Sequence, residues 1–229
     1  MMIWLAIPLT VLLYLLTKKL ARKVKSPLVN TIMLPALAII ALLLQTGQDS
    51  ADYQAGTRPL TLLLELAVVC FALPLYQQAA KIRQRLMPIL LCCSLSALIS
   101  VGTTLVIGGL MQAQPQLLAS IATKSITTPL AMSVSQSMGG IPAIAAGLVV
   151  IVGMMGAIIG FPLLRWAGIH HPEAQGLAMG AGAHAIGIAA AAEVGPVQGA
   201  FASLAMVVCG IATAVLAPPL FHLYLWFIA

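Results

Sequence analysis

Charged residues are scarce in this sequence, and acidic ones scarcest. Of 229 residues, 7% are charged, five are Asp or Glu, and 61% are hydrophobic, with a mean hydropathy of +1.07. This composition excludes a soluble domain and predicts a polytopic membrane protein. A cation/proton antiporter is also disfavoured, since that function relies on carboxylates at membrane depth and the breaks of the two interrupted stretches described below have no acidic residue nearer than Glu193.

Catalytic and nucleic-acid-binding motifs are absent as well. With no HExxH pair, Walker loop, dinucleotide fingerprint or nucleophile triad, we predict no enzyme, no catalytic residue and no cofactor. All four cysteines lie inside apolar runs, which favours helix packing over a disulfide framework or a metal site: Cys70, Cys92, Cys93 and Cys209. No basic patch is interleaved with aromatic residues, so nucleic acid is not expected as a partner.

The basic residues gather in two clusters between apolar runs. Five lie between Lys18 and Lys25, and three between Lys81 and Arg85. Cytoplasmic loops carry such clusters, so we predict a bacterial inner-membrane protein with its N-terminus and C-terminus in the periplasm. The first apolar run has no positive charge before it, unlike a secretory signal, and is interpreted as a retained helix.

The predicted fold class is all-α, with about six full transmembrane helices. The apolar runs cover roughly residues 3–16, 28–44, 60–75, 87–111, 141–164 and 201–228. The loop 45–58, which holds Asp49 and Asp52, is expected on the outside.

Two other apolar stretches are broken by residues that a spanning helix avoids. As one straight helix, residues 114–140 would reach ~40 Å, more than the ~30 Å hydrocarbon core. Splitting this stretch at 124–129 gives two half-helices of about ten residues, which favours a re-entrant hairpin with its tip near the midplane. A single broken span is the alternative. Thr128 before Pro129 is typical of an N-cap followed by the first helical residue, and Gly139-Gly140 predicts a turn.

The first break concentrates polar side chains: Lys124, Ser125, Thr127 and Thr128. A Lys at membrane depth is costly and therefore a functional-site candidate. The amides at the start of the following half-helix also attract anions. This pattern predicts a binding site for a small carboxylate. The alternative is a Lys that snorkels to the interface, with hydroxyls bonded to their own helix.

The second break lies at 182–187, within 172–195. His184 stands among glycines that let a backbone approach a ligand, and Gly187 is the second substrate-binding candidate there. His184 could also take up a proton and couple transport to the gradient. Glu193 and Glu65 are weaker proton-coupling candidates. The alternative is a helix-packing face with a satisfied histidine.

The two breaks belong to similar halves, since each is followed by a Gly-Pro turn and an apolar helix. We expect residues 1–112, with spans one to four, to form a scaffold, and repeats 113–168 and 169–229 to form a transport core. If both breaks are hairpins, the repeats are inverted and Arg165 faces the cytoplasm. If both are full spans, the repeats are parallel and Arg165 lies outside. We favour hairpins.

Four short motifs resemble the LrgB/CidB family of bacterial membrane proteins over nearly the whole chain. They are Lys-Ser-Ile-Thr-Thr-Pro at 124–129, Gly-Gly-Ile-Pro at 139–142, the Gly-Ala-Phe-Ala-Ser-Leu-Ala run at 199–205 and Pro-Leu-Tyr at 74–76. The second break departs from the family, with Ala-His-Ala-Ile-Gly-Ile-Ala where Ser-His-Gly-Ile-Gly-Thr-Ala is usual. Glu65-Leu66 also stands where the family often has Gly-Pro.

This resemblance implies two functions. Family members are described as antiholin-like or murein-hydrolase regulators, whereas a plant chloroplast relative transports glycolate and glycerate and some bacterial relatives are linked to pyruvate uptake. We therefore expect secondary transport of a small monocarboxylate (glycolate, glycerate, lactate or pyruvate), with optional proton coupling. The alternative is an antiholin-like regulator of a holin-type pore and of murein hydrolase activity. Expected partners are the carboxylate, membrane lipid, a second copy in an elevator-like homodimer, and a small LrgA/CidA-type membrane protein.

Overall fold

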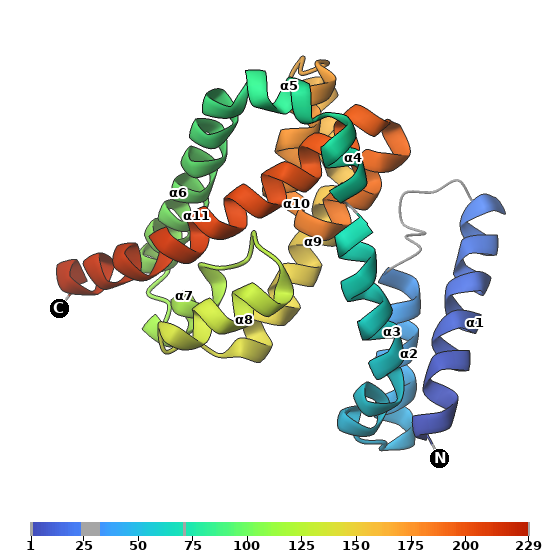
Figure 1. Cartoon of the computed structure of the whole chain (residues 1–229). Coiled ribbons are helices and arrows are strands. Elements are labelled where there is room, and N and C mark those ends of the chain that lie inside the picture. The colour runs from blue at the N-terminus through green and yellow to red at the C-terminus, as the bar shows by residue number, and fades with distance from the viewer. Residues whose placement is uncertain (1, 24–32, 71, 229) are drawn as a thin grey trace. The chain divides into compact units, whose positions relative to one another are not determined.

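The computed structural model describes residues 2–23, 33–70 and 72–228, and every regular element in these ranges is a helix. The chain divides into an N-terminal unit, Met1–Ala72, and a C-terminal unit, Leu73–Ala229 (Figure 1). Within the described ranges, four helices are long and apolar enough to cross a membrane: α6 (Leu86–Leu110), α9 (Pro142–Trp166), α10 (Pro172–Val194) and α11 (Pro196–Ile228). The prediction of an all-α membrane protein is confirmed at this level.

The N-terminal unit consists of α1 (Met2–Lys23), α2 (Met33–Thr46) and α3 (Ser50–Cys70), with α1 packed against the other two. The first apolar run, at about 3–16, is short for a bilayer and open to extension by its flanks, and α1 does continue to Lys23 through most of the first basic cluster, where a loop was predicted. The predicted loop 45–58 is also wrong. The Asp49 carboxylate accepts a hydrogen bond from the Ala51 amide at 3.0 Å, and α3 begins there. Residues 24–32 of the predicted loop and second span lie outside the described residues.

Short helices follow the N-terminal unit. The predicted end of the third span at residue 75 falls in α4 (Ala72–Gln77), which carries the Pro-Leu-Tyr motif, and residue 71 between α3 and α4 lies outside the described residues. The second basic loop contains α5 (Ala79–Gln84), on which the side chains of Lys81 and Arg83 are exposed. Arg85 then occupies the N-cap position of α6.

The core of the C-terminal unit lies between α6 and α11. Ile89 and Cys93 of α6 form a buried cluster with residues of α11: Phe201, Ala205 and Cys209. The opposite faces expose large apolar side chains, including Leu91 and Ile107 of α6 and Val215 of α11. Exposed apolar surface of this extent is stable in lipid rather than in water.

The α11 helix is longer than predicted. It begins at Pro196 rather than near residue 201 and has 33 residues. At 1.5 Å per residue it reaches ~50 Å, more than the ~30 Å hydrocarbon core. Pro196 has no amide hydrogen to leave unpaired, so it starts this helix well.

The first predicted break is confirmed. The stretch splits into α7 (Pro115–Ile121) and α8 (Thr128–Ser137), which pack against each other and appear as a short pair in Figure 1. The Thr128 cap prediction is wrong by one residue, because the extended backbone of Thr127 (φ −66°, ψ 147°) makes it the N-cap. Gly139 turns the chain at φ 78°, and the Ile141 amide then donates to Ser120 Oγ at 2.7 Å.

The second predicted break is also confirmed, at His184 within α10. A Cβ on Gly187 would overlap the carbonyl oxygen of Met179, eight residues earlier, although eight residues of straight helix span ~12 Å. A Cβ on Gly176 would lie 2.5 Å from the carbonyl oxygen of Gln198 in the first turn of α11. The second half of α10 therefore folds back along the first, and the chain leaves near the end where it entered.

Candidate functional site

Lys124 lies in the non-helical segment between α7 and α8 and is partly buried. Its ammonium donates to the Ser100 carbonyl oxygen at 3.3 Å, to Ser100 Oγ at 3.4 Å and to the Thr104 hydroxyl of α6. Within the described residues, no carboxylate lies within ion-pair distance of this ammonium. The ion pair that these residues do form joins Arg85 and Glu173 and does not involve Lys124. Among the described residues, the partners of this amino group are therefore neutral oxygens.

The other predicted residues of the first break lie around Lys124. The Ser125 hydroxyl is 2.9 Å from the Ser100 hydroxyl, so two successive residues of the break contact one turn of α6. Thr127 caps α8 by position, yet its hydroxyl makes no cap hydrogen bond, and Thr128 is the first residue of that helix. Both threonine side chains are partly buried. The break thus combines an ammonium with hydroxyls beside a helix N-terminus, a suitable set for a small anion.

His184 holds the second break together. Its backbone has φ 40° and ψ −131°, a conformation that is strained for a residue with a Cβ. The ring is 3% exposed, and Nε2 lies 2.9 Å from the carbonyl oxygen of Val149 in α9. Since a carbonyl oxygen can only accept, Nε2 carries the hydrogen. The ring fits because Gly153 has no side chain: a Cβ there would lie 2.5 Å from His184 Cε1.

Three further residues were predicted as site residues: Gly187, Glu193 and Glu65. Gly187 is buried, and it permits the close approach between the two halves of α10. Glu193 is exposed near the C-terminus of α10. Glu65 is on α3 in the N-terminal unit, and its side chain lies outside the described residues.

The two breaks approach the same region of α9. Val149, which pairs with the His184 ring, belongs to one buried cluster with Ile126 of the first break and Ala131 of α8. Ser100 lies near the middle of the 25-residue α6, and Val149 lies about a third of the way along the 25-residue α9. Among the described residues, no hydrogen bond joins His184 to the polar residues at 124–128, so the breaks share packing rather than a common polar network.

Four residues of this region were missed by sequence reasoning. Ser100 and Thr104 had a weak signal, since they lie four residues apart in an apolar helix and therefore share a face. Val149 acts through its backbone, and Gly153 acts through the absence of a side chain. Neither leaves a trace in the sequence that links it to His184.

Comparison with known proteins gives consistent results. Residues 10–223 match the family model described as the LrgB-like family. An uncharacterized protein of Haemophilus influenzae is 36% identical over 96% of this chain and 95% of its own. The holin-like protein CidB of Staphylococcus epidermidis is 34% identical, with 96% of each chain covered. The antiholin-like protein LrgB of Bacillus cereus is 32% identical over 73% of each chain. No solved structure matches this chain.

Proposed function

Because this chain belongs to the LrgB-like family, we propose that it acts in the membrane as an antiholin-like regulator of a holin-type pore and of murein hydrolase activity. The names of two relatives, the holin-like protein CidB and the antiholin-like protein LrgB, support this function. The four long apolar helices fit a protein that acts within the bilayer. A small LrgA/CidA-type membrane protein is the partner we propose for it.

The test of this function is cellular. Cells that lack the chain should change their rate of autolysis and their murein hydrolase activity, and expression of the chain should restore both. If the chain regulates through its helix surfaces, the Lys124→Met and His184→Asn variants should restore autolysis and murein hydrolase activity as well as the unmodified chain does. Autolysis that is indifferent to the presence of the chain would contradict the regulatory function.

One observation favours a second function, secondary transport of a small monocarboxylate such as glycolate, glycerate, lactate or pyruvate. It is the Lys124 ammonium, held by Ser100 and Thr104 near the middle of an apolar helix. A charge in apolar surroundings is costly unless an opposite charge joins it. A monocarboxylate would neutralise this one. His184 is the candidate for substrate contact or proton coupling, and we propose no enzymatic step.

The transport function requires a particular arrangement in the membrane, which we propose as two re-entrant hairpins in an inverted repeat. The α7–α8 pair lies between the end of α6 and the start of α9, whereas α10 lies between the end of α9 and the start of α11. The hairpins would then enter from opposite faces, with tips near the midplane. A scaffold at 1–112, an elevator-like motion, a homodimer and periplasmic termini complete this proposal.

Uptake into proteoliposomes tests the transport function directly. Purified chain should take up labelled glycolate or pyruvate saturably, with and without a pH gradient, and Lys124→Ala should abolish uptake. Absence of uptake by well-folded protein, even with the small partner added, would leave only the regulatory function.

A single cysteine tests the hairpins separately. With Arg165→Cys in a chain without its native cysteines, a membrane-impermeant thiol reagent should label this position only from the cytoplasmic side. Labelling from the periplasm would instead require two full spans and parallel repeats.

A further inference from the structure

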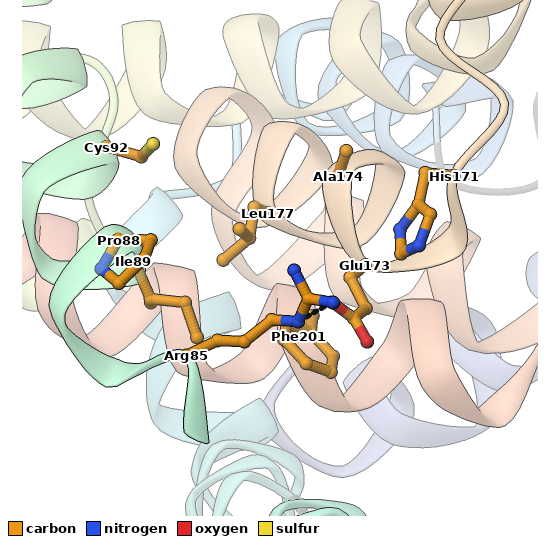
Figure 2. A pocket seen from close by; sticks show the side chains of 9 residues that line it. All are labelled: Arg85, Pro88, Ile89, Cys92, His171, Glu173, Ala174, Leu177 and Phe201. Carbon is orange, nitrogen blue, oxygen red and sulfur yellow. Dashed lines mark ion pairs between the residues drawn. The ribbon is translucent and has the colours of Figure 1, made fainter. Parts of the chain in front are cut away.

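A hollow lies at one end of the C-terminal unit, where α6 and α10 both begin. Its floor is apolar, built from Pro88 and Ile89 of α6, Leu177 of α10 and Phe201 of α11. Arg85 and Glu173 stand at its rim, and Figure 2 shows the Arg85 side chain reaching from α6 to Glu173. Neither break contributes a residue to this hollow.

The Arg85 side chain forms an ion pair with Glu173 and remains largely exposed. Arg85 Nε lies 3.2 Å from Glu173 Oε2, while the Arg85 side chain is 62% exposed and that of Glu173 is 16% exposed. A guanidinium has five N–H donors in a rigid fork. The ion pair joins Glu173 to Nε, so the terminal nitrogens can donate to an anion at the same time. The ion pair thus orients the charged group over the apolar floor.

The surroundings of the rim are positively charged. Lys81 and Arg83 are exposed on α5, directly before Arg85. With Glu173 as the acid at the rim, these three basic residues leave a local excess of two positive charges. The hollow also lies at the end of apolar helices long enough to span a bilayer, where lipid headgroups are found.

From this combination we propose that the hollow binds an anionic phospholipid. The headgroup phosphate pairs with the terminal nitrogens of Arg85, and the first carbons of an acyl chain lie against Ile89, Leu177 and Phe201. Basic pockets between helix ends bind anionic lipids through the same two contacts. Because α6 and α10 both contribute, the bound lipid joins the start of the folded-back α10 to α6.

The test compares two arginines two residues apart. Binding of phosphatidylglycerol and phosphatidylcholine to the full chain in detergent is measured by native mass spectrometry, with thermal unfolding as a second readout. Arg85→Gln should weaken phosphatidylglycerol binding about fivefold, since one basic residue at an anionic surface contributes ~1 kcal/mol. Arg83→Gln removes the same charge from an exposed position outside the hollow and should change binding less than about twofold.

Two controls separate lipid binding from structure. Glu173→Gln breaks the ion pair and keeps Arg85, so phosphatidylglycerol binding should persist or strengthen; a loss equal to that of Arg85→Gln would overturn the proposal. Equal losses in Arg85→Gln and Arg83→Gln, or equal binding of the two lipids, would also overturn it. Glycerol phosphate should compete poorly, and competition as strong as that of the lipid would assign the rim to a soluble phosphate.

Discussion

The two breaks interrupt apolar helical segments by different means. Between α7 and α8 the chain leaves the helix for several residues, and side chains from α6 contact it: Ser100 meets both Lys124 and Ser125. In α10 a single residue, His184, leaves the helix, and its partner is the backbone of Val149. The first break is rich in hydrogen-bonding side chains, whereas the second depends on a strained backbone with glycine and alanine around it.

The two breaks therefore have a similar backbone course but different side chains. Both segments double back, yet the positive charge lies in one break and the strained residue in the other. Strain at one residue costs about 1–3 kcal/mol and persists only where the surroundings enforce it. On the transport proposal, the Lys124 break would contact the ligand, whereas the His184 break fixes α10 to α9 through Val149.

The largest expected effect is at Lys124. Lys124→Met keeps a long side chain and removes the charge, so small-anion binding or uptake should fall about 10–100-fold, the loss expected for hydrogen bonds to a charged group. The thermal unfolding temperature should stay the same or rise, since an unneutralised ammonium is removed from apolar surroundings. A variant that unfolds at lower temperature would show that Lys124 stabilises the fold, and the contrast between the breaks would disappear.

The second effect sharpens the role of α9. Gly153→Ala places a Cβ against the His184 ring and should lower the free energy of unfolding by about 1–3 kcal/mol. The matched control is Gly147→Ala on the same helix, where nothing lies within 4 Å of the added Cβ. That change should stabilise the helix by about 0.5–1 kcal/mol. Equal unfolding temperatures for the two variants would refute the fit between Gly153 and His184.

Backbone strain at His184 is tested by two truncations. His184→Gly and His184→Ala both remove the ring and its bond to Val149, but only glycine adopts φ 40° readily. We expect the glycine variant to be more stable by about 1 kcal/mol in thermal or denaturant unfolding. An alanine variant of equal or greater stability would mean that the residue is not strained.

The smallest effect is expected at Ser100. Ser100→Ala removes one hydroxyl that contacts both Lys124 and Ser125 and should cost about 0.5–1.5 kcal/mol. Ser94→Ala, at an exposed position of the same helix, is the control and should be neutral. Indistinguishable unfolding temperatures for these two variants would show that α6 does not hold the first break.

The sequence predicted where helices are interrupted, but not the residues at which helices begin and end. Pro129 and the polar run before it predicted the first break, and the glycines around His184 predicted the second. The ends of α1 and the start of α3 were misjudged, because charged residues were taken for loops although they continue or cap a helix. Thr127 and Thr128 are equally good caps, so only the backbone conformation distinguishes them.

For each contact in the candidate site, only one of the two partners was predicted from the sequence. The sequence marks Lys124 and His184 as unusual, but their partners lie 24 and 35 residues away. Hydroxyl side chains such as those of Ser100 and Thr104 are common in membrane helices, and Thr104 also bonds its own helix at the Ser100 carbonyl oxygen, so neither residue stands out. A backbone carbonyl such as that of Val149 has no residue identity to read.

The missing side chain at Gly153 carries an evolutionary constraint. Because the His184 ring occupies the space where a Cβ would stand, neither position can vary freely while the other stays fixed. Among relatives that keep the histidine, residue 153 should remain glycine; where it has gained a side chain, a smaller residue should stand at 184. Two positions 31 residues apart should thus drift as a pair, a signature that an alignment of distant relatives can reveal without any experiment on this chain.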